Sequence, residues 1–158
     1  MAVWQVDFYV VPQKALSSNR GPLTPGALED GTWWAGASFP DDYARFIGAF
    51  LPPGRSWDPE LETWGAEDGN RIDVWTTNGE VRSVMVRVDV RKLDSTFGAA
   101  LLIFLKNIGG VLVRRDGLVV EPTINAYAGS LRNSSAWRYA SDPAAWLAAN
   151  MPKHDDDA

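Results

Sequence analysis

The sequence has no cysteine and a single histidine among its 158 residues. Without cysteine there is no disulfide framework, no thiolate nucleophile and no cysteine-ligated zinc. The histidine, His154, lies four residues before the end beside three aspartates, where a side chain lacks the fixed position that a general base needs. Catalysis would have to rely on paired carboxylates, lysine, tyrosine or an oxygen-held Mg²⁺. We therefore lean toward a non-enzymatic protein with no cofactor and no metal.

The sequence also lacks an excess of basic charge and a long apolar run. Fifteen basic against twenty acidic residues give a net charge of −5, which disfavours nucleic acid and anionic membranes as partners. The longest apolar run, Phe97 to Leu105, is too short to span a bilayer. The N-terminus begins with a strand pattern in place of a signal peptide. We expect a cytoplasmic protein, and the use of alanine, arginine and tryptophan suggests a bacterial one.

The length corresponds to one domain, which we place at residues 1–152. Residues 12–32 are rich in proline, glycine and serine without periodicity, which predicts a long flexible loop with one helical turn near Pro25 to Leu28. Residues 153–158 read as a disordered charged tail. The hairpin patterns predict an α+β fold with an antiparallel sheet of about five to six strands and about two to three helices packed mainly on one face.

The clearest local feature is a β-hairpin from Arg71 to Arg91 with Asn78-Gly79 at its tip. A two-residue loop would pair Val74 with Ser83 and put the two apolar rows on opposite faces. A three-residue loop, 77–79, would pair Ile72 with Val84 and align them, with Gly79 at the position that needs a positive φ. We predict this bulged turn.

Residues 97–108 predict a helix with almost no polar face before Lys106. A helix that is apolar all round must be covered on more than one side. In so small a domain the cover is either a loop or a second subunit, and we expect a homodimer through this helix.

Alternating charged and large side chains mark one side of the 71–91 hairpin. With the apolar rows aligned, seven residues share one face: Arg71, Asp73, Trp75, Met85, Arg87, Asp89 and Arg91. The simplest interpretation is the solvent-facing side of a half-covered sheet, with weak Arg–Asp pairs. The alternative is a protein-binding face, because arginine, tryptophan and methionine are enriched in interface cores.

Eight tryptophans are unusual for this length, and several lie in segments rich in glycine and proline. Such rings either plug the core or line a pocket. If they form a pocket, its walls are Trp33, Trp34, Trp57 and Trp64, with Asp58, Glu60 and Glu62 nearby. That set would suit a sugar or a cationic ligand, or an enzyme working with oxygen ligands.

The stretch from Arg87 to Pro122 combines a strand of alternating charge, the apolar run Phe97 to Leu105, and a short hairpin ending at Glu121-Pro122. It resembles small bacterial α+β proteins of the toxin-immunity type. The resemblance implies a non-enzymatic protein that binds and blocks a toxin domain, and an acidic chain would suit a basic nuclease toxin through charge steering. No site residue is carried over from it. The sequence thus favours a cytoplasmic protein-binding protein, with a small-molecule-binding domain as the alternative.

Overall fold

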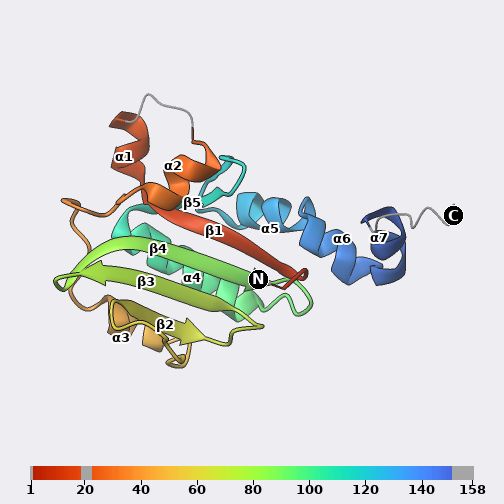
Figure 1. The fold of residues 1–158 in the computed structure, drawn as a ribbon, viewed down its shortest axis with the longest axis horizontal. Coiled ribbons are helices and arrows are strands. Elements are labelled where there is room, and N and C mark those ends of the chain that lie inside the picture. The colour runs from red at the N-terminus through yellow and green to blue at the C-terminus, as the bar shows by residue number, and fades with distance from the viewer. Residues whose placement is uncertain (1, 19–22, 151–158) are drawn as a thin grey trace, which may run out of the picture.

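A single antiparallel sheet organises the molecule, whose structure, a computed structural model, describes residues 2–18 and 23–150. The strands lie in the order β2-β3-β4-β1-β5-β6, which confirms the predicted α+β class (Figure 1). Their bounds are β1 Gln5–Pro12, β2 Leu61–Gly65, β3 Arg71–Thr77, β4 Glu80–Asp89, β5 Gly110–Arg114 and β6 Val119–Val120. The predicted tail at 153–158, with His154, lies outside the described residues.

Helices are more numerous than the sequence predicted. The described chain forms α1 Gln13–Ser18, α2 Pro25–Asp30, α3 Tyr43–Gly48, α4 Ser95–Ile108, α5 Ile124–Arg132, α6 Ser135–Ser141 and α7 Pro143–Asn150. Most are short, and a polar residue starts several of them: the hydroxyls of Thr24, Thr123 and Ser134 each accept a hydrogen bond from a first-turn N–H. No described helix is long and apolar enough to cross a membrane.

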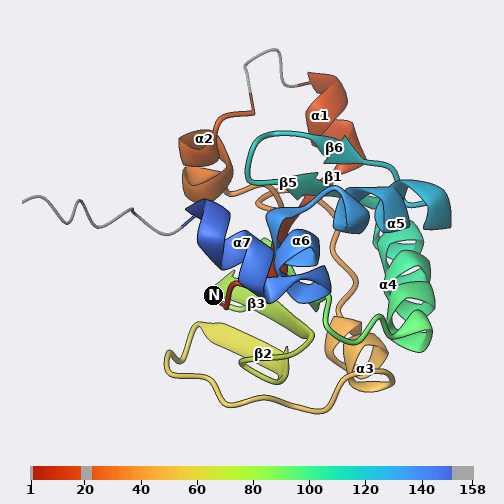
Figure 2. The same ribbon diagram turned by 90° about the vertical axis from the view of Figure 1, so that its right-hand side faces the viewer.

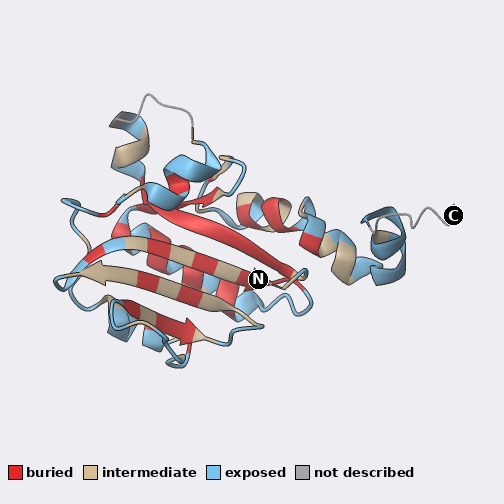
Figure 3. Ribbon diagram, viewed as in Figure 1, coloured by how far each residue is buried: buried red, intermediate tan, exposed pale blue. Residues whose placement is uncertain are grey.

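The main core lies between one face of the sheet and α4. Period-two alternation sends Phe8 and Val10 of β1, with the valines of β4, to the same side as Ile72 and Val74. α4 packs its Leu101 and Leu105 against them. Figure 3 shows the alternation of buried and half-buried residues along β3 and β4, and the continuous burial of the central strand β1.

A smaller cluster occupies the opposite face over β1 and β5. Leu28 of α2 packs there on Tyr9, Val11, Val111 and Val113. Figure 2 shows α4 and α2 on opposite sides of the sheet. The prediction of a loop over residues 12–32 is therefore wrong for its described part, because α1 and α2 form there, with Leu28 buried on the sheet and Ala15 and Leu16 partly buried. The helical turn expected near Pro25 to Leu28 is the start of α2.

The 71–91 hairpin aligns its apolar rows by another route than the predicted turn. Its tip is the two-residue loop, with Asn78 and Gly79 at φ 51° and 78° and Thr77 opposite Glu80. A β-bulge then inserts Arg82, so that Val74 pairs with Val84. The predicted three-residue turn and the Ile72–Val84 pairing are thus wrong, whereas the shared face of the two apolar rows is confirmed.

The bulge coincides with a contact from a distant segment. The carbonyl of Arg82 accepts a hydrogen bond of 3.1 Å from the backbone N–H of Trp34. The indole of Trp34 is also fixed, since Nε1 donates to the carbonyl of Val10 at 2.8 Å. The chain between α2 and α3 is therefore attached to both β1 and β4.

Neighbouring elements of the same chain cover most of α4. Tyr127 and Leu131 of α5 join its buried side, and Phe39 and Phe50 contact it from another direction. Of the large apolar residues on α4, Ile103 is the exposed one. The missing polar face that motivated a homodimer is thus largely explained within one chain, and dimerisation through residues 97–108 stays a prediction.

Candidate protein-binding face

The second face of β2, β3 and β4 forms the candidate site, which we call the open face. Among the described helices, α1 and α2 lie over the β1–β5 part of this side, and none lies over β3 and β4 (Figure 1). The register places Arg71 opposite Arg87, Asp73 opposite Met85, and Trp75 opposite Ser83. Asp89 ends β4 on the same side. The structure therefore brings the sequence-predicted residues onto one surface, with Arg91 at its edge.

An ion-pair network fixes the β2–β3 part of the open face. Arg71 Nε donates to Asp73 Oδ1 at 2.7 Å, and Arg71 Nη2 donates to Thr63 Oγ1 at 3.2 Å. The Thr63 hydroxyl in turn donates to Asp73 Oδ1. Both charged side chains are largely shielded by this arrangement. The pair runs along one strand, between residues two apart.

A second pair joins β4 to the central strand. Arg87 Nε donates to Asp7 Oδ1 at 3.0 Å, with side-chain exposures of 21% and 3% respectively. A carboxylate as buried as Asp7 has to be paired, because an unpaired buried charge is strongly destabilising. Asp7 of β1 therefore fixes Arg87 at the side of the open face that adjoins the central strand.

The third ion pair, between Arg91 and Asp89, lies at the end of β4. Arg91 Nη2 donates to Asp89 Oδ2 at 2.8 Å and to the carbonyl of Asp68 at 3.0 Å. The Arg91 guanidinium also lies over the ring of Trp4, 4.1 Å from its centroid. Hydrogen bonding to Asp89 raises the pKa of Arg91. Arg91 is thus held in one position.

Aromatic stacking continues from Trp4 into the C-terminal helices. The ring of Trp4 stacks on Tyr139 of α6 at 6.4 Å, and Tyr139 meets Trp146 of α7 edge to face at 5.4 Å. Figure 1 shows these helices beyond the end of the sheet. Trp4 therefore links the rim of the open face to α6 and α7.

An aromatic pair stands at the other margin of the open face. Trp57, in the segment before β2, meets Trp75 edge to face with ring centroids 5.6 Å apart. Its exposed fraction is 75%, the largest among the exposed large hydrophobic residues of the described chain. The sequence predicts Trp57 in one pocket with three other tryptophans. Trp57 lies shortly before Leu61, and Leu61 pairs with Trp75 across β2 and β3. This pairing brings the ring of Trp57 next to that of Trp75.

The four tryptophans of the predicted pocket lie in different environments. Trp34 is 2% exposed and Trp64 is buried against Tyr43. Trp33 is half-buried between the two apolar clusters, whereas Trp57 is at the surface. The two cavities that Trp34 lines include none of the other three. The structure thus does not bring these rings together around one ligand.

The carboxylates of the open face all take part in ion pairs with arginines. Asp7, Asp73 and Asp89 are each engaged by an arginine. Among the described residues no group of three or more histidine, cysteine, aspartate or glutamate side chains could hold a metal ion. The arrangement is a surface on which each aspartate is paired with an arginine and an exposed indole stands at the margin.

No family model, curated protein or solved structure matches this chain.

Proposed function

We propose that this chain is a non-enzymatic protein-binding protein that uses the open face as its contact surface. The observation that carries the proposal is Trp57, an exposed indole beside a sheet face over which none of the described helices lies. Tryptophan and arginine dominate the binding energy of protein interfaces, particularly where neighbouring contacts exclude water. Trp57 and Trp75 would form the anchor, and the arginines of β3 and β4 the surrounding polar contacts.

Pre-organisation supports binding by this face. Arg71 and Arg91 are held by two or more hydrogen bonds each, so little side-chain freedom remains to be lost on association. Arg87 uses Nε for Asp7, and its terminal nitrogens have no hydrogen bond to another described residue. These N–H groups are the donors that the face offers to a partner.

The proposed partner is a toxin domain, and the chain would act as an immunity-type inhibitor in the cytoplasm of a bacterium. The resemblance of residues 87–122 to that class supports this choice. The net charge of −5 favours a basic partner through long-range steering. The six charges of the open face, three arginines and three aspartates, cancel, so steering would come from the rest of the chain.

Affinity capture with matched variants tests the proposal. Wild type, Trp57→Ala and Ile103→Ala, an exposed position on α4, are immobilised and exposed to lysate of the native cell. We expect one protein that wild type and Ile103→Ala retain and that Trp57→Ala binds at least about tenfold more weakly. A protein lost equally from both variants, or retained by all three, would count against the open face.

The immunity role has its own readout. The captured protein is expressed in a cell that lacks this chain, and growth is compared with and without co-expression. A toxin domain arrests growth, and wild type restores it more effectively than Trp57→Ala. A captured protein that does not affect growth would contradict the inhibitor role but not the binding face.

A further inference from the structure

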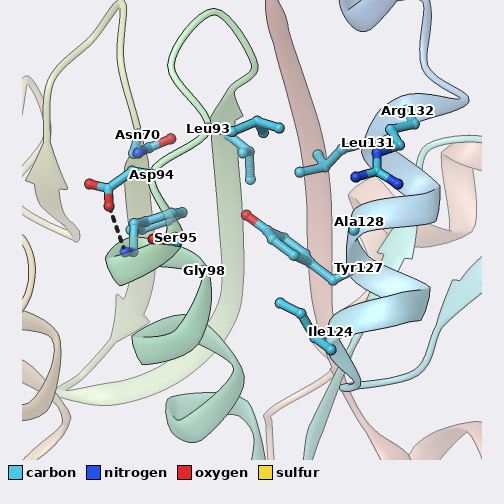
Figure 4. Close-up of a pocket in the computed structure, with 12 residues that line it drawn as sticks. Asn70, Leu93, Asp94, Ser95, Gly98, Ile124, Tyr127, Ala128, Leu131 and Arg132 are labelled. Carbon is cyan, nitrogen blue, oxygen red and sulfur yellow. Dashed lines mark hydrogen bonds between the residues drawn. The ribbon is translucent and has the colours of Figure 1, made fainter.

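An apolar cavity lies on the other side of the sheet, where α5 crosses the first turn of α4 (Figure 4). Its volume is about 150 Å³. The walls are almost entirely apolar, with Val88 from β4, Phe97 from α4 and Leu131 from α5. Leu93 and Ile124 flank it, and both side chains are about half exposed. The cavity thus has an apolar rim that is accessible from solvent.

Tyr127 provides a polar group inside this apolar space. The residue is 6% exposed, and its hydroxyl points into the cavity in Figure 4. It makes no hydrogen bond to any described residue. Because the rim of the cavity is open to solvent, a ligand that carries an acceptor can replace water at this hydroxyl. Burial, and the nearby charge of Asp94, raise the pKa of Tyr127, so the hydroxyl remains a donor at neutral pH.

Gly98 determines where the tyrosine ring lies. A Cβ at this position would be 3.1 Å from Cε1 of Tyr127, closer than ordinary packing. The missing side chain lets the ring lie against α4. The Asp94 carboxylate is already used, since Oδ1 accepts from the N–H groups of Thr96 and Phe97 at 2.9 and 3.1 Å. The Tyr127 hydroxyl is therefore a polar atom of the cavity that remains available to a ligand.

Size and charge define what the cavity accepts. An apolar cavity of about 150 Å³ holds a single six-membered ring. Asp94 and Arg132, which also line it, carry opposite charges, so neither an anion nor a cation is favoured. We propose that this cavity binds a neutral, single-ring ligand that carries one hydrogen-bond acceptor for the Tyr127 hydroxyl. The inference is independent of the open face.

Two probes that differ in one acceptor test the proposal. Acetophenone carries a carbonyl oxygen, whereas ethylbenzene has the same ring without it. Binding is followed by amide ¹H–¹⁵N chemical shifts in wild type, in Tyr127→Phe and in a control, Tyr43→Phe, whose hydroxyl donates to Glu62 near α3. We expect both probes to shift amides of α4 and α5 saturably. Tyr127→Phe should weaken acetophenone about five- to tenfold and leave ethylbenzene unchanged.

Three results would overturn the proposal. The first is no saturable shift at the cavity with either probe. The second is an equal loss of both probes in Tyr127→Phe, or the same acetophenone loss in Tyr43→Phe. The third comes from Ala128→Leu, which narrows the cavity without touching the hydroxyl and should abolish binding of both probes. Unchanged binding in that variant would place the probes elsewhere, and it remains decisive if Tyr127→Phe does not fold.

Discussion

Truncation of two tryptophans should lower stability by very different amounts, although the chemical change is the same. Trp34 is 2% exposed and its Nε1–H donates to the Val10 carbonyl, so Trp34→Ala loses a packed core ring and a hydrogen bond. Core Trp→Ala changes cost about 3–5 kcal/mol, and the lost hydrogen bond adds about 1. Trp57 is 75% exposed and buries about a quarter of its surface. At about 25 cal/mol per Å² for roughly 60 Å², Trp57→Ala costs at most about 1.5 kcal/mol.

Urea denaturation and thermal melts of wild type, Trp34→Ala and Trp57→Ala measure the difference in stability. In a domain of this size 1 kcal/mol shifts Tm by about 2–4 °C, so Trp34→Ala should melt at least about 8 °C lower and Trp57→Ala less than about 6 °C lower. Equal losses in the two variants would show that Trp57 is part of the core, which would remove the exposed anchor from the binding proposal. A loss below about 1 kcal/mol for Trp34→Ala would contradict its placement between β1 and β4.

Three further changes test the supporting structure. Asp7→Leu should cost about 1–3 kcal/mol in urea denaturation because it leaves Arg87 unpaired, and adding Arg87→Leu should recover most of that loss; no recovery would mean that the pair is not coupled. Because the pKa of Tyr127 is raised by folding, the folded protein keeps the phenol proton to a higher pH than the unfolded chain does. The contribution of Tyr127 to the free energy of unfolding is therefore fully present below about pH 10 and is lost as the pH rises further. Tyr127→Phe should reduce that alkaline slope by up to about 1.4 kcal/mol per pH unit, and an unchanged slope would contradict the buried hydroxyl. Gly65→Ala should destabilise far more than Gly79→Ala, since both have positive φ but only Gly65 would bring a Cβ against a carbonyl oxygen; comparable melts would refute that geometry.

Period-two alternation predicted correctly which side chains share one side of the hairpin, because it depends only on neighbouring residues. Arg71, Asp73 and Trp75 share a side whatever the turn, and the need to bury the valines of β4 aligns the two strands. The turn itself was not predictable in this way. The bulge at Arg82 is accompanied by a hydrogen bond from Trp34, a residue nearly fifty positions away, and no local pattern in the hairpin encodes that contact.

The short helices and the α4–α5 cavity both depend on contacts between segments that are far apart in the sequence. Residues 13–30 have weak intrinsic helical patterning, and α2 forms because the sheet provides a surface for Leu28. The cavity depends on Tyr127 lying against Gly98, a contact between two helices that meet only in the folded chain. The sequence shows both residues but not their distance.

Site-specific photo-crosslinking tests the central claim, that the open face binds another protein, most directly. A benzophenone side chain is introduced at Ser83, opposite Trp75 on the open face, and in a second variant at Ile103 on α4. In the native cell, irradiation of the Ser83 variant should give one dominant crosslinked protein that the Ile103 variant does not give. A partner that crosslinks from Ile103 and not from Ser83 would contradict the account and would place the interface on α4.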